Sequence, residues 1–194
     1  MAVRKVIRAG DSRLKAKNKQ ISSIKSAKTQ KLIKDLISAM HKVELIGIAA
    51  PQIGENWMVF ITEPRKTKAR KGAKEITDKI RVYINPKFVF KSKEESIIWE
   101  GCGSIGELFG PVSRPKEVQI EATDEKGKKF TLRADGLLAR VIQHEMDHLA
   151  GVEFIQKVTD YNKIMVQENY KKYVRNSPLQ KKNSKITKIE YKNL

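Results

Sequence analysis

The chain has 194 residues, enough for one domain with a substantial buried core. It contains no run of about 18 apolar residues, which excludes a transmembrane helix, and residues 1–8 lack the continuous apolar stretch of a secretory signal peptide. The single cysteine, Cys102, excludes an intrachain disulfide and indicates a reducing, cytoplasmic setting.

The net charge of +18 is concentrated in three segments. Residues 1–30, 65–74 and 175–194 together hold 21 of the 40 basic residues and two of the 22 acidic residues. The rest of the chain is therefore close to neutral. Basic segments attached to a neutral body suggest contact with a polyanion such as RNA. The alternative is a lysine-rich composition that only favours solubility.

Hydrophobic spacing and turn signals predict most of the elements. In chain order, the predictions are a short strand at 3–8, an amphipathic helix at 23–42, strands at 57–62 and 80–90, a hairpin at 117–123 and 128–134, and helices at 135–150 and 161–174. The remaining residues, 175–194, are polar and lack periodicity, so we expect a basic, mobile tail. We therefore expect a catalytic domain over residues 1–174 and a tail over 175–194. Because strands cluster between two main helices, this order is typical of an α+β fold, with mixed or antiparallel strands around the 135–150 helix and a C-terminal helix.

The predicted helix at 135–150 carries the most informative motif. Asp135 is a plausible N-cap, and Gly151 is placed to end the helix. His144 and His148 lie one turn apart, on the same stripe as Leu137 and Val141, so both face the protein interior. Two imidazoles so placed can bind one metal ion, and Glu145 beside them can transfer protons.

A catalytic metal site needs a third protein ligand. Cys102 is the best candidate, because a thiolate is a strong, soft ligand and this is the only cysteine in the chain. A zinc peptidase would instead use a downstream glutamate, and Glu168 is placed for that role. A third interpretation is a non-catalytic RNA- or ribosome-binding protein in which both histidines are structural.

Three separated segments resemble the signature motifs of the peptide deformylase family. They are Ile46-Gly47-Ile48-Ala49-Ala50-Pro51-Gln52, Glu100-Gly101-Cys102-Gly103-Ser104 and Gln143-His144-Glu145-Met146-Asp147-His148. The resemblance extends over residues 4–158 and begins almost at Met1, so we expect no organellar transit peptide.

The resemblance implies a specific site and reaction. The metal, Fe(II) in the cell and replaceable by Zn, Ni or Co, would be held by Cys102, His144 and His148. Glu145 would move protons, and Gln52 and the Gly103 N–H would stabilise the oxyanion. The reaction would release formate from the N-terminal formyl-methionine of new polypeptides. The pocket for the methionine side chain would be lined by Ile46, Gly47, Ile98, Leu137 and Val141.

Three positions depart from the family pattern. Leu45 stands where a glycine is usual, Gly103 where leucine is usual and Gly106 where proline is common. None of them removes a catalytic group, so we expect an active enzyme. The basic segments are expected to contact the ribosome, and residues 175–194, far downstream of the motifs, are not expected to affect cleavage of a short peptide.

Overall fold

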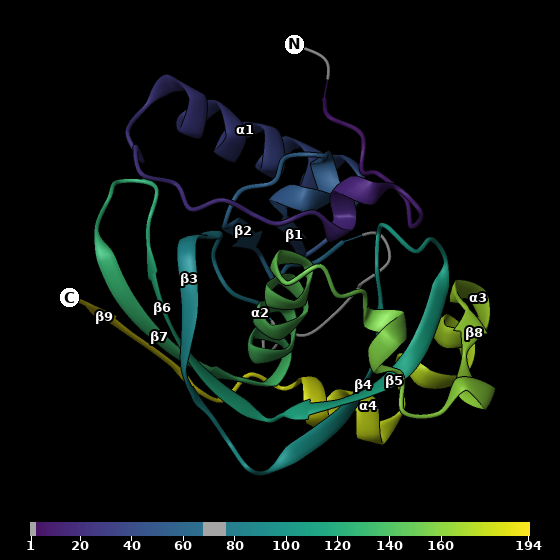
Figure 1. The fold of residues 1–194 in the computed structure, drawn as a ribbon. Helices are drawn as coiled ribbons and strands as arrows, with labels where there is room; N and C mark the ends of the chain where they lie inside the picture. The colour runs from purple at the N-terminus through teal and green to yellow at the C-terminus, as the bar shows by residue number, and fades with distance from the viewer. Residues whose placement is uncertain (1–2, 68–76) are drawn as a thin grey trace.

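The computed structural model describes residues 3–67 and 77–194 (Figure 1). Its helices are α1 (Ala27–Lys42), α2 (Gly136–Leu149), α3 (Gln167–Asn169) and α4 (Pro178–Ser184). Its strands are β1 (Gly47–Ala49), β2 (Val59–Thr62), β3 (Arg81–Lys91), β4 (Glu95–Gly101), β5 (Leu108–Pro115), β6 (Glu117–Thr123), β7 (Lys129–Asp135), β8 (Met165–Val166) and β9 (Ile189–Asn193). Among the described residues, no helix is long and apolar enough to cross a membrane.

The strands of the described residues form two antiparallel sheets. One has the order β1-β2-β3-β6-β7-β9 and the other the order β4-β5-β8, and every pair of neighbouring strands is antiparallel. Helix α2 lies between the two sheets at the centre of the molecule (Figure 1). This arrangement confirms the predicted α+β class and the central position of the helix that carries the histidines.

Two faces of α2 have different surroundings. Leu138 and Ile142 are fully buried in the core formed with β6 and β7. Leu137 and Val141, one position earlier in each turn, line a groove instead. Gly151 adopts a φ of 72° just after the helix, as its sequence position predicts. The helix therefore divides its side chains between the core and a functional surface.

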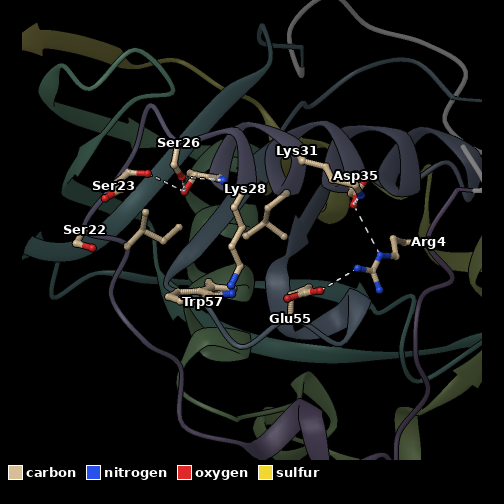
Figure 2. A pocket seen from close by; sticks show the side chains of 12 residues that line it. Arg4, Ser22, Ser23, Ser26, Lys28, Lys31, Asp35, Glu55 and Trp57 are labelled. Atoms are coloured by element: carbon tan, nitrogen blue, oxygen red, sulfur yellow. Dashed lines mark hydrogen bonds and ion pairs between the residues drawn. The ribbon is translucent and has the colours of Figure 1, made fainter.

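The N-terminal arm packs across the molecule as an extended segment and does not form the strand predicted at 3–8. Ile7 N–H donates to the carbonyl of Gln52 and Ala9 N–H donates to the carbonyl of Ser104, each at 2.8 Å. These two bonds reach different parts of the chain, so no strand ladder forms. Figure 2 shows Arg4 of this arm in ion pairs with Glu55, at 2.9 Å, and with Asp35 on α1, at 3.7 Å.

The predicted strands at 57–62 and 80–90 and the hairpin at 117–134 correspond to β2, β3 and β6–β7. Asn85 and Pro86 lie at a register shift in the pairing of β3 with β6, between Ile84 and Lys87. Asn85 adopts a φ of 50° there. The helix predicted at 23–42 begins at Ala27, because the Ser26 hydroxyl accepts the N–H of Thr29 and caps it.

The C-terminal third differs most from the sequence prediction. A continuous helix at 161–174 is absent; the segment forms a 3-10 turn, then β8, which pairs with β5, then α3 and a π-helical turn at Tyr170–Val174. Residues 175–194 form α4 and β9, and β9 pairs with β7 along five residues.

The packing around this segment is close. A Cβ on Gly136 would lie 2.1 Å from the carbonyl oxygen of Lys185. Asp135, which precedes α2 as predicted, does not use its carboxylate to cap that helix; the carboxylate accepts the N–H groups of Thr187 and Lys188. The predicted boundary between a domain and a tail at residue 174 stays a prediction. The basic segment at 65–74 lies mostly within residues 68–76, outside the described residues.

Candidate metal centre

Three ligand atoms meet where α2 faces the segment after β4. The Cys102 sulfur and one nitrogen from each of His144 and His148 all lie within 4.8 Å of one another. Cys102 Sγ is 3.2 Å from His148 Nε2. The spacing of four residues along α2 brings the two imidazoles together, and the turn that follows β4 brings the thiol to them.

The chemistry of these donors fits a divalent ion. Tetrahedral coordination by a thiolate and an imidazole at ordinary bond lengths separates sulfur from nitrogen by about 3.6 Å. The observed Sγ–Nε2 distance of 3.2 Å is close to that separation. The cysteine and one histidine are buried and the other histidine is partly buried, so the protein shields the site on most sides. One soft thiolate with two imidazoles is a donor set suited to Fe, Zn, Ni or Co.

A buried carboxylate orients one of the histidines. Glu100 Oε2 accepts the Nδ1–H of His144 at 2.9 Å, which leaves the Nε2 of this ring free to face Cys102. Glu100 itself accepts hydrogen bonds from Arg114 at 2.7 and 2.9 Å and from Arg140 at 2.9 Å. A carboxylate that holds a ligating histidine fixes its tautomer and its ring orientation.

The charges of this cluster also set the protonation states. Burial disfavours ionisation of Glu100, but the charge of Arg114 and the hydrogen bonds from His144 and Arg114 outweigh it and hold the pKa of Glu100 well below its usual value. Burial likewise opposes ionisation of Cys102. The charge of His148 and the hydrogen bonds of both histidines outweigh this and hold the pKa of the Cys102 thiol well below its usual value. The thiolate that a metal ion requires is therefore the favoured form.

Glu145 lies beside the ligands with part of its carboxylate unpaired. It is 3% exposed, and its Oε2 has no hydrogen-bond partner among the described residues. Burial raises the pKa of Glu145 to about 7, although the charges of His144 and His148 lower it in part. Gly47 makes room for this side chain, because a Cβ at Gly47 would lie 2.4 Å from Glu145 Oε1.

Gln52 points its amide nitrogen at the cysteine. Its Oε1 accepts the N–H of Ala49 at 2.8 Å, so its Nε2 faces the other way, 3.6 Å from Cys102 Sγ and 3.4 Å from Ser104 Oγ. Gln52 is 1% exposed. Gly103 follows the cysteine, and its carbonyl accepts a hydrogen bond from Arg8 at 2.7 Å.

A groove of about 1140 Å³ runs along these residues. The five residues expected in the methionine pocket all line it: Ile46, Gly47, Ile98, Leu137 and Val141. Glu168, the alternative third ligand, is exposed and lies outside the cluster found among the described residues.

Sequence reasoning missed the roles of Glu100, Arg114 and Arg140. Arg140 is adjacent in sequence to the groove-lining stripe of α2, yet it is 4% exposed and bonds to Glu100 and to the carbonyl of Val112. Arg114 also donates to Asp147, within the histidine motif, at 2.5 Å. Glu100 stands two residues before Cys102, and this closeness to a candidate ligand is the one sequence feature that indicates a role for Glu100 at the site.

Comparisons with known proteins agree with this geometry. The family model described as polypeptide deformylase matches residues 3–163. The peptide deformylase of Pseudothermotoga lettingae is 35% identical over 175 residues, covering 90% of this chain and 94% of that protein. That of Rhodopseudomonas palustris is 34% identical over 172 residues, covering 89% of this chain and 95% of that protein.

Solved structures of the family have the same fold. A peptide deformylase from Synechococcus elongatus in complex with actinonin is 32% identical, with a TM-score of 0.71 over 84% of this chain and 86% of that one. A Met-Ala-Ser bound peptide deformylase from Acinetobacter baumannii is 28% identical, with a TM-score of 0.76 over 81% of this chain and 99% of that one. Together with the Cys-His-His metal site, these similarities show that the chain belongs to the peptide deformylase family.

Proposed function

We propose that this metal-dependent hydrolase removes the formyl group from the N-terminal formyl-methionine of newly made polypeptides and releases formate. The proposal rests on one observation. Cys102, His144 and His148 meet beside the buried carboxylate of Glu145, whose Oε2 has no hydrogen-bond partner among the described residues. A divalent ion held there supplies, when bound, a water of lowered pKa and a positive charge near the substrate carbonyl. We propose Fe(II) in the cell, with Zn, Ni or Co as replacements.

Glu145 is the proposed acid and base. Its buried carboxylate takes a proton from the attacking water and passes one to the leaving amine. Burial raises the pKa of this carboxyl group to about 7. A bound cation would lower this pKa again and favour the carboxylate form needed at the start of the reaction.

Two donors are proposed to stabilise the oxyanion. The Nε2 of Gln52 faces the cysteine because its Oε1 is held by Ala49, so its N–H groups point into the site. The backbone N–H of Gly103 is the second donor, and this role does not depend on a side chain. The held orientation of Gln52 reduces the reorganisation needed when negative charge develops on the substrate.

The proposed methionine pocket is the part of the groove formed by Ile46, Gly47, Ile98, Leu137 and Val141. Apolar and small side chains suit a thioether chain. The relative that holds Met-Ala-Ser supports a peptide that begins with methionine as the occupant of this groove.

A variant pair tests the proposal. Glu145→Gln keeps the size of the side chain but loses the base, so it should retain the metal and lose roughly 10²–10⁴-fold in kcat on formyl-Met-Ala-Ser. Glu168→Gln is the matched control and should retain full activity. Formate release and metal content are measured on the same preparations. Unchanged turnover in Glu145→Gln, or metal loss in Glu168→Gln, would overturn the assignment.

We further propose that the enzyme works in the cytoplasm and contacts ribosomes through its basic segments. Basic side chains on a largely neutral body favour a surface rich in RNA phosphate. Ribosome cosedimentation should weaken steeply with salt and should weaken further when the basic residues of segment 1–30 are neutralised. If ribosome binding does not depend on salt, the basic segments do not mediate it, and their charge serves only solubility.

A further inference from the structure

The groove extends beyond the region needed for formyl-methionine. Part of it is lined by residues of the C-terminal segment, which we call the C-terminal wall and define as residues 167–185. The wall lies outside residues 3–163, the range matched by the family model, so the three shared motifs do not specify its side chains.

The wall is held firmly against the sheet that leads to Cys102. Gln180 is 6% exposed, and its side-chain amide bonds to the backbone of Trp99 on β4, accepting its N–H at 3.1 Å and donating to its carbonyl at 3.4 Å. Asn183 donates to the carbonyl of Ile97 at 2.9 Å. Side chains from α4 thus form hydrogen bonds with backbone groups along the edge of β4 that a neighbouring strand would otherwise use.

Aromatic stacking connects the wall to the cysteine turn. Tyr170 stacks on Phe109 with ring centroids 4.1 Å apart and planes inclined by 4°, and Gln180 donates to the Tyr170 hydroxyl at 3.3 Å. The Phe109 ring in turn covers Gly101, where a Cβ would lie 2.6 Å from it. Since Gly101 precedes Cys102, the wall has a fixed position relative to the metal site.

The charged side chains that this wall presents to the groove are all cationic. Lys171, Arg175, Lys181 and Lys185 line the groove from the wall, and Lys5, Arg8 and Lys42 line it from other parts of the chain. The acidic residues at its rim are Glu44 and Glu107; Glu100 and Glu145 lie buried within the site. Several like charges along one groove reinforce one another and raise the local concentration of opposite charge.

We propose that the C-terminal wall binds the peptide residues that follow formyl-methionine and that its cations favour substrates with Asp or Glu at those positions. This proposal rests on the function proposed above.

The expected effect on kcat/KM is modest. Each exposed charge pair between peptide and wall should contribute a factor on the order of 1.5- to 5-fold. A substrate with two acidic residues should therefore exceed one with two lysines by about tenfold or more in kcat/KM at low salt. The effect should lie in KM, because the wall does not touch the scissile bond.

The test compares formyl-Met-Ala-Ser, formyl-Met-Asp-Asp and formyl-Met-Lys-Lys on the full-length, metal-loaded enzyme. Measurements at about 0.01 M and about 1 M salt span Debye lengths of about 30 Å and 3 Å. We expect the acidic peptide to be preferred at low salt and the three kcat/KM values to converge at high salt. Equal values for the acidic and basic peptides at low salt would overturn the proposal. Absence of formate release from all three peptides would instead contradict the proposed function.

Two variants with the same net charge locate the effect. Lys171→Glu with Lys181→Glu reverses two charges that line the groove. Lys172→Glu with Lys182→Glu reverses two exposed neighbours that do not line it. The first variant should lose or invert the preference for the acidic peptide, and the second should keep it. If the peptide preference changes equally in both variants, only the net charge of the protein matters, and the proposal is overturned. Loss of ribosome binding in the first variant with an unchanged peptide preference would make the wall an RNA contact and would also overturn the proposal.

Discussion

Leu45 and Gly103 should act as a pair: the double replacement should restore most of the turnover that Gly103→Leu alone loses. The motif resemblance described above implies glycine at position 45 and leucine at position 103, and this chain has the two residue types the other way round. In the structure the two face each other: a Cβ added to Gly103 would lie 2.9 Å from Leu45 Cδ1 and 3.3 Å from Cδ2. The leucine side chain at position 45 therefore occupies the space that a side chain at position 103 would need.

The distances indicate the size of the effect. Ordinary carbon contacts begin near 3.4 Å, so even a methyl group at 103 is too close, and Gly103→Leu must displace either Leu45 or the turn that holds Cys102. Leu45 is held by its backbone, because its N–H donates to Met40 and its carbonyl accepts from Arg65. Overpacking of this kind costs about 1–3 kcal/mol. If the Gly103 N–H is moved out of line, a further loss of roughly 10²–10³-fold in kcat is expected.

The assay is a double-mutant cycle on formyl-Met-Ala-Ser. Gly103→Leu should lower kcat by at least about tenfold. Leu45→Gly alone should mainly raise KM by opening the groove. The double variant should recover most of the kcat lost in Gly103→Leu, a coupling that residues without mutual contact do not show. Metal content of all four proteins separates loss of the ligand turn from loss of the oxyanion donor. If the losses of the two single variants simply multiply in the double variant, the proposed pairing is refuted.

Three further outcomes follow from the site. Gly47→Ala places a Cβ 2.4 Å from Glu145 Oε1, so kcat should fall by about 10²-fold or more while metal content, measured in parallel, stays at the parent level. Cys102→Ala should lower metal content and activity together; full metal retention would remove Cys102 from the ligand set. Glu100→Gln should weaken metal binding by about 10–100-fold in a chelator competition, because His144 loses the carboxylate that orients it. Parent-like metal affinity in that variant would contradict this role.

The sequence predicted the centre of the site because its signals are local. The spacing of His144 and His148 follows from helix geometry, and their stripe follows from the apolar residues beside them. Cys102 was favoured as the third ligand because it was the strongest available donor, while Glu168 remained possible. The structure excludes Glu168 from the cluster formed by the described residues.

The surroundings of the site could not be predicted in the same way. Glu100 is bonded by Arg114 and Arg140, residues 14 and 40 positions away in the chain. No periodicity connects these residues, and charged side chains usually indicate an exposed surface. Their burial depends on the way β4 and β5 pack beside α2. The same limit applies to Leu45 and Gly103, whose departures from the family pattern can be read separately but whose contact exists only in three dimensions.

The C-terminal segment shows why distance along the chain is a poor guide to distance from the metal site. Its polar composition predicted a tail, and its position after the motifs predicted no effect on cleavage of a short peptide. In the fold, Gln180 bonds to the backbone of Trp99, three residues before Cys102, and β9 completes the sheet beside the start of α2. These contacts use side-chain amides and backbone groups, which carry no hydrophobic period that sequence reading could detect. Gln180 and Ser184 are buried while Lys181 stays exposed, so the short helix packs one side toward the protein and presents a cation to the groove. The segment therefore lines the groove that holds the metal site, although it stands after all three motifs in the chain.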